Sequence, residues 1–163
     1  MTVLLSKDIN IEHLQSLLDR YGMALKIIDA NKPIPGSFWQ PPEAGLIDNT
    51  LYIRPDTPVH SALHETCHYI CMDKLRRENL DTNAGGDYQE EDAVCYLQIL
   101  LSDYIKEMNH HRMLTDMDEW GYSFRLGSAK AWFEKDAEDA QQWLVRHRII
   151  DKTNKTTGLL RSN

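Results

Sequence analysis

The stretch Val59–Met72 reads VHSALHETCHYICM and contains the pattern His-Glu-x-x-His at residues 64–68. On a helix, side chains four residues apart lie on the same face, so His64 and His68 would point the same way with Glu65 beside them. Neutral imidazole is a good ligand for Zn²⁺, and a neighbouring carboxylate can accept a proton from water that the metal activates. The spacing therefore predicts a zinc site with His64 and His68 as ligands and Glu65 as the catalytic base.

The pattern has the helical context that it needs. Asp56-Thr57-Pro58 resembles a helix start with a proline in the first turn, and the residues from Ala62 to Met72 are largely apolar. We therefore expect a partly buried helix here. The alternative is an ordinary core helix with two exposed histidines, because a short pattern of this kind also arises by chance.

Composition limits the fold and the partners. The chain has 163 residues, of which 42% are hydrophobic, which is enough for one domain. We assign residues 1–150 to this domain and residues 151–163 to a polar C-terminal tail that is expected to be frayed. The net charge is −7 and the longest basic cluster is Lys74–Arg77. These charges disfavour nucleic acid and anionic membranes as partners and favour a peptide, protein or small molecule.

The sequence also indicates the cellular compartment. Its start lacks the basic segment of a signal peptide, and 18 apolar residues never occur in succession. The three cysteines, Cys67, Cys71 and Cys95, are an odd number that fits a reducing compartment better than a disulfide framework. We therefore expect a soluble, cytoplasmic protein.

Around the motif the pattern predicts helices and a few short strands, which is an α+β fold. Upstream we expect a helix that ends near Tyr21, a strand over Met23–Asp29 and a proline-rich loop over Asn31–Gly45. Phe38 and Trp39 in this loop are expected to pin it to the body or to line a cleft. Two short apolar runs around Asp48-Asn49-Thr50 then predict a β-hairpin, at Leu46-Ile47 and at Leu51–Ile53.

Downstream of the motif the pattern alternates between loops and helices. Arg76–Gly86 is polar and predicts a loop, and Asp87 is expected to cap a buried helix over Tyr88–Lys106. Asn109–Gly127 is interpreted as irregular with short helical pieces. Ser128 is expected to cap one final amphipathic helix.

The order of hairpin, motif helix, loop and acid-led buried helix resembles the minimal core of the zincin metallopeptidases. More closely, GLIDNTLYIRPDTPVHSALHETCHYI at residues 45–70 and EEDAVCYLQILL at residues 90–101 resemble the ImmA/IrrE-type (DUF955-like) family. In that family a strand precedes the motif helix, and a later E-x-x-A-x-x-[FY]-x-x-x-L-L helix supplies the third zinc ligand. The resemblance implies zinc-dependent peptidase activity and a small antiparallel sheet packed on the motif helix.

The third ligand has two candidates on the later helix. The family pattern, placed on Ala93 and Tyr96, makes Glu90 the ligand, and Glu91 is its rival. Asp87-x-x-Glu90 is also a capping-box arrangement, which would occupy Glu90 with backbone donors. The family often has a polar partner for a zinc histidine four residues after this ligand, whereas this chain has Val94 there.

Two functions follow from these residues. In the first, His64, His68 and a glutamate at 90 or 91 hold Zn²⁺, and the chain hydrolyses peptide bonds. In the second, Cys71 or His60 closes the zinc shell and the chain is a non-catalytic, metal-stabilised interaction module. Candidates for stabilising an oxyanion in the first case are His110, His111, Tyr122 and Arg125.

Overall fold

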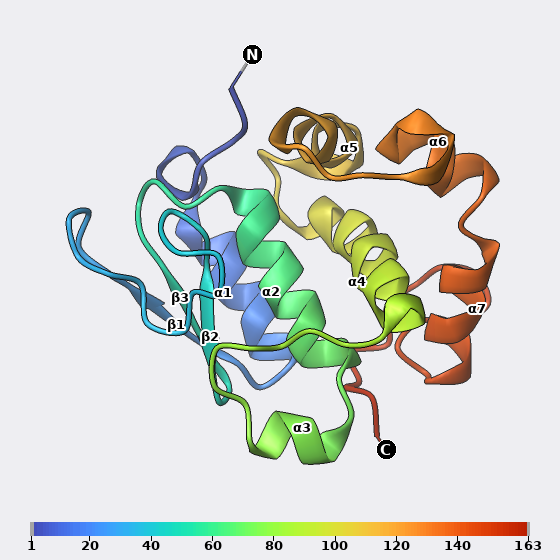
Figure 1. The fold of residues 1–163 in the computed structure, drawn as a ribbon, viewed down its shortest axis with the longest axis horizontal. Helices are drawn as coiled ribbons and strands as arrows, with labels where there is room; N and C mark the ends of the chain where they lie inside the picture. Colours follow the sequence, from blue (N-terminus) through green and yellow to red (C-terminus); the bar gives the residue numbers. More distant parts are fainter. Residues whose placement is uncertain (1, 163) are drawn as a thin grey trace.

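The computed structural model describes residues 2–162, which form an α+β fold with seven α-helices and a three-stranded sheet (Figure 1). Met1 and Asn163, the ends of the predicted domain and tail, lie outside the described residues. The strands are β1 (Ala24–Ile27), β2 (Gly45–Ile47) and β3 (Thr50–Ile53). The helices are α1 (Ile11–Arg20), α2 (Val59–Cys71), α3 (Lys74–Glu78), α4 (Tyr88–Leu101), α5 (Asn109–Trp120), α6 (Ala129–Lys135) and α7 (Glu138–Arg146).

The sheet has the order β1-β3-β2. The predicted hairpin is confirmed, because β2 pairs antiparallel with β3 and Ile47 lies opposite Thr50. The third strand corrects the expectation of a purely antiparallel sheet: β1 runs parallel to β3, with Ala24 opposite Thr50. The long loop after β1 reverses the chain before β2, so β3 enters between the two strands and makes the sheet mixed.

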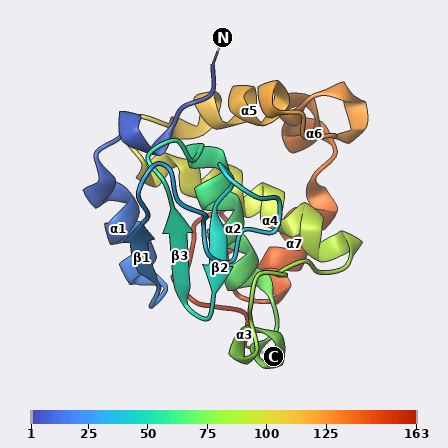
Figure 2. The same cartoon turned by 60° about the vertical axis from the view of Figure 1, so that its left-hand side comes forward.

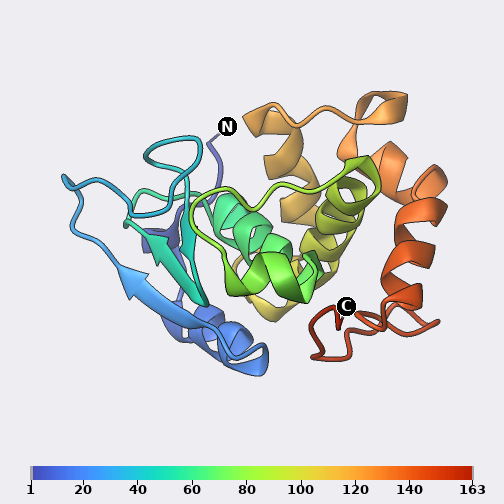
Figure 3. The same ribbon diagram turned by 60° about the horizontal axis from the view of Figure 1, so that its bottom comes forward.

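The elements are stacked in layers around α2. In Figures 2 and 3, helices α1 and α2 lie on one side of the sheet, and α1 packs on β1 while α2 packs on β2 and β3. On its other side α2 packs against α4, and α4 packs in turn against α7. The side chains of Leu63, Cys67 and Ile70 are fully buried in this arrangement. The motif helix is therefore central, and it carries the site between the sheet and α4.

The helix caps agree with the sequence better than the helix lengths do. Asp87 accepts a hydrogen bond from the Glu90 amide, and Ser128 accepts one from the Ala131 amide, as predicted. Helix α2 begins after Pro58 without a side-chain cap. Helix α4 ends at Leu101 and is followed by a 3₁₀ turn, which is shorter than the predicted helix.

Three other segments differ from the prediction. Residues 109–120 form the regular helix α5, because Met113, Leu114 and Met117 give it a buried face. The predicted final helix is two helices, α6 and α7, because the chain leaves helical geometry at Asp136. Helix α3 lies in the region that was expected to be loop.

The polar tail packs against the body of the molecule rather than fraying from it. The Arg161 amide donates to the Ile70 carbonyl at 2.9 Å, and the Arg77 guanidinium donates to the Arg161 carbonyl. Thr156 is hydrogen-bonded to the Tyr104 hydroxyl. These contacts join the tail to the end of α2 and to the 3₁₀ turn that follows α4. No helix within residues 2–162 has both the length and the apolar character needed to cross a membrane.

Candidate metal centre

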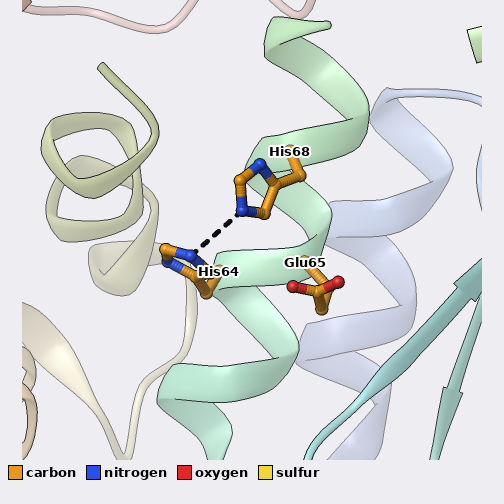
Figure 4. A group of neighbouring side chains, drawn as sticks. All are labelled: His64, Glu65 and His68. Carbon is orange, nitrogen blue, oxygen red and sulfur yellow. Dashed lines mark hydrogen bonds between the residues drawn. The ribbon is translucent and has the colours of Figure 1, made fainter. Parts of the chain in front are cut away.

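Helix α2 brings the two motif histidines together on one face. Figure 4 shows the rings of His64 and His68 turned toward one another, with the Glu65 carboxylate beside them. Their Nε2 atoms are 3.1 Å apart, and ligand atoms of all three residues lie within 4.8 Å of one another. This is the arrangement that the spacing predicted.

The distance between the two nitrogens fits a shared metal ion. Two nitrogen ligands at tetrahedral angles around zinc, each about 2.0–2.1 Å from the metal, are separated by about 3.3 Å. His68 is buried and His64 is partly buried, and desolvation is the main cause that lowers the pKa of both histidines below the ordinary value. The histidines are therefore held neutral, which is the form that binds a metal.

Gln98 on α4 fixes the orientation of the His64 ring. Its amide nitrogen donates to the His60 carbonyl at 3.0 Å, so its Oε1 is the end that faces His64 Nδ1, at 2.7 Å. His64 must then carry its proton on Nδ1 and keep the Nε2 lone pair free for a metal. Gln98 thus provides the polar partner of a zinc-site histidine that the resemblance led us to expect at residue 94, where this chain has Val94.

Gln98 was missed in the sequence. The sequence did contain a signal for its role, because a glutamine within an otherwise apolar helix segment is buried and must find hydrogen-bond partners.

His68 has no partner comparable to the one that Gln98 gives His64. The Nδ1 atom of His68 is buried and has no hydrogen-bond partner among the described residues.

The two candidate third ligands face different neighbours. Glu91 Oε2 lies 3.6 Å from His68 Nε2, and Glu91 Oε1 accepts a hydrogen bond from the Gly86 amide. Glu91 also lines the cavities beside the motif. The geometry therefore selects Glu91 for the position beside the histidines.

Glu90 is instead committed to two arginines. Its Oε1 accepts hydrogen bonds from Arg76 and from Arg161, and the side chain is buried. The family pattern pointed to Glu90, and this position is not beside the histidines. The physical reason is ion pairing: Arg76 from α3 and Arg161 from the tail hold the Glu90 carboxylate at the C-terminal end of α2, where Arg161 also donates to the Cys71 carbonyl.

Glu65 has the properties of a proton carrier. Its side chain is buried, and burial, together with the charges of Glu43 and Glu91, raises the pKa of its carboxyl group to about 8. A metal cation nearby would oppose this shift. A carboxyl group that titrates near neutral pH can both accept and return a proton during a reaction.

Two cavities meet at the motif, and both reach His64, Glu65 and Glu91. The smaller has a volume of ≈ 250 Å³ and is otherwise lined by Phe38, Trp39, His68 and residues 82–85. The larger has a volume of ≈ 640 Å³ and is otherwise lined by residues 39–44, Ser61, Cys95 and residues 120–122. The expectation that Phe38 and Trp39 line a cleft is confirmed.

The residues suggested for stabilising an oxyanion differ in whether they lie at the cavities. Of the four possible oxyanion-stabilising residues, Tyr122 lines the larger cavity, whereas Arg125 pairs with Asp136 and His110 lies near Asp103. His60 is fully buried, and its Nδ1 lies 3.1 Å from the Tyr122 hydroxyl.

The two residues suggested for a closed zinc shell lie outside the cluster of ligands. Within residues 2–162, the side chains whose ligand atoms all lie within 4.8 Å of one another are His64, Glu65 and His68, without Glu91, Cys71 or His60. Of the latter three, Glu91 has an oxygen 3.6 Å from His68 Nε2. No protein-family model, curated protein or solved structure matches this chain. The functional interpretation therefore depends on the site itself.

Proposed function

We propose that this chain is a zinc-dependent metallopeptidase that hydrolyses peptide bonds. The observation that carries the proposal is the pair of imidazole Nε2 atoms, 3.1 Å apart, with Glu65 and Glu91 beside them where two cavities meet. A peptide could reach such a site, as hydrolysis requires. The net charge of −7 favours a peptide or protein substrate over a nucleic acid.

Each residue has a defined part in this proposal. His64, His68 and Glu91 would hold the zinc ion, and Gln98 orients His64. Bound zinc would supply Lewis acidity that activates water and polarises the substrate carbonyl. Glu65, beside the two histidines, accepts the proton of the attacking water and then donates it to the leaving amine.

The non-catalytic interaction module is the weaker proposal. A closed site needs a fourth protein ligand, and the residues suggested for it, Cys71 and His60, stand apart from the histidine pair. His60 is already engaged with Tyr122. These contacts favour a site with a position left for the substrate.

The test is the variant Glu65→Gln, compared with wild type for zinc content and for cleavage of a broad peptide library. We expect about one zinc per chain in both proteins, because Glu65 is not one of the proposed ligands. Hydrolysis should fall by roughly 10²- to 10⁴-fold, the loss typical of removing a general base.

A matched control is Glu78→Gln, which removes an exposed carboxylate from α3 and should leave cleavage unchanged. If the zinc-loaded Glu65→Gln protein cleaves as fast as wild type, Glu65 is not the base. If neither protein binds a stoichiometric transition metal, the metal centre itself is wrong.

A further inference from the structure

The larger cavity beside the motif has a distinctive lining. Three carboxylates, those of Glu43, Glu65 and Glu91, share it with aromatic side chains, and the described part of the chain contributes no lysine or arginine to its lining. The aromatic and proline residues of this wall are Trp39, Pro41, Pro42, Trp120 and Tyr122. The cavity is therefore acidic and aromatic at once.

Glu43 is fixed in this wall by two hydrogen bonds. The Trp120 indole donates to its Oε1 at 2.8 Å, and the Ser61 hydroxyl donates to its Oε2. Ser61 lies on α2, one turn before the motif, and Trp120 is the last residue of α5, so two helices hold the carboxylate jointly. A carboxylate has about four acceptor positions, and these bonds use two of them. Glu43 can therefore accept hydrogen bonds from a ligand without moving.

The charges of the cavity leave Glu43 without a counterion. The two charges of a zinc ion would be balanced by Glu65 and Glu91, the carboxylates beside the histidines. Within residues 2–162, the donors to the Glu43 side chain are both neutral, the indole of Trp120 and the hydroxyl of Ser61. A half-buried carboxylate with neutral partners attracts a cation.

The aromatic residues favour the same kind of ligand. Trp39 is 72% exposed and Trp120 is 42% exposed, so parts of both indoles are open to a ligand. Ammonium and guanidinium groups are attracted to the face of a tryptophan ring. Aromatic surface also contacts the methylene groups of a long side chain.

We propose that the larger cavity binds a lysine or arginine side chain of the substrate, with Glu43 as the specificity-determining carboxylate. This inference rests on the proposed peptidase function. It adds the substrate class: peptides with a basic residue close to the bond that is cleaved.

The experiment measures binding in the Glu65→Gln background, so that its result does not depend on hydrolysis. Calorimetry would compare peptides with blocked termini that differ only in having lysine, arginine or norleucine at one position, scanned along the peptide. We expect lysine and arginine peptides to bind at least about tenfold more tightly than norleucine peptides, as for a partly buried charge pair. Adding Glu43→Gln should remove this preference and should change the affinity for norleucine peptides little.

Glu119→Gln is the matched control, because it removes an exposed carboxylate next to Trp120 on the same helix. It should leave the preference for basic peptides intact. Equal affinity for basic and norleucine peptides, or no measurable binding of either, would overturn the proposal. A preference that appears only with a free peptide amino terminus would also overturn it, because the cavity would then bind a terminal amine. If the zinc-loaded wild-type protein cleaves no peptide while the Glu65→Gln protein keeps the preference for basic peptides, the proposed hydrolysis alone would be contradicted.

Discussion

Gln98 illustrates how one side chain can determine the chemistry of its neighbour. It accepts a hydrogen bond from His64 Nδ1 and donates one to the His60 carbonyl, so its own orientation is fixed by the backbone of α2. The His64 proton is thereby held on the nitrogen that faces away from His68. The site depends in this way on α4 as well as on the motif helix.

The residue-scale prediction concerns the two neighbouring glutamates. Glu91→Gln should lower zinc affinity by more than the roughly 10- to 100-fold typical of losing an outer hydrogen-bond partner, because it removes a proposed ligand charge. Glu90→Gln should leave zinc affinity nearly unchanged, yet it should lower the free energy of unfolding. We expect a loss of roughly 3 kcal/mol, the low end for breaking a buried ion pair, because Arg76 is 37% exposed.

The two variants are each other's control, because they make the same chemical change at adjacent positions. Zinc affinity is measured by competition with a chelating dye, and stability by urea unfolding of the zinc-free proteins. The reverse ranking of zinc affinities would return the third-ligand role to Glu90.

At the residue scale, the sequence predicts arrangements of neighbouring residues but not contacts between residues far apart in the chain. The positions of His64, Glu65 and His68 follow from helical spacing alone, and the structure brings them together as expected. The choice between Glu90 and Glu91 stayed open in the sequence, because the partners of Glu90, Arg76 and Arg161, are 14 and 71 residues away from it in the chain.

At the scale of elements, the first turn of α4 is the link between the caps and the site. Asp87 caps this helix, and Glu90 and Glu91 both lie in the turn that the cap holds. Asp87→Ala should lower the free energy of unfolding by about 1 kcal/mol, the usual effect of losing a cap. It should also weaken zinc binding, because a frayed first turn no longer holds Glu91 beside His68.

Ser128→Ala is the control for this prediction. Ser128 caps α6 through an equivalent bond to the Ala131 amide, and α6 does not contribute to the metal centre. Loss of this cap should lower the stability measured by thermal unfolding about as much as Asp87→Ala does, and it should leave the zinc affinity unchanged. Equal zinc affinities in the two variants would show that the cap does not support the site.

The elements that were predicted poorly are those whose form depends on packing. The hairpin and both caps follow from local turn and cap residues, and all three were predicted. The parallel pairing of β1 with β3 joins segments far apart in the chain, which local patterns do not record. Helix α5 was missed because its buried methionines are spaced among charged residues and histidines.

At the scale of the whole molecule, the site lies between layers that the ends of the chain help to hold. The sheet supports α2 from one side and α4 supports it from the other, while α1 packs on β1 and α7 packs on α4 (Figure 1). The C-terminal segment returns to the end of α2, where the Arg161 side chain donates to the Cys71 carbonyl and to Glu90. The tail thus connects the motif helix with the first turn of α4.

This arrangement predicts that the tail contributes to stability, although the sequence suggested a frayed end. Arg161→Gln should lower the free energy of unfolding by about 1–3 kcal/mol, because the buried Glu90 carboxylate would lose one of its two charged partners. The loss is limited because Arg76 remains as the other partner. Lys152→Gln removes an exposed charge from the same tail and should change stability little. Urea unfolding of the zinc-free proteins measures both effects without a contribution from metal binding. Equal stability of the two variants would mean that the tail does not dock on α2 and α4 in solution, because an undocked Arg161 would be as dispensable as Lys152.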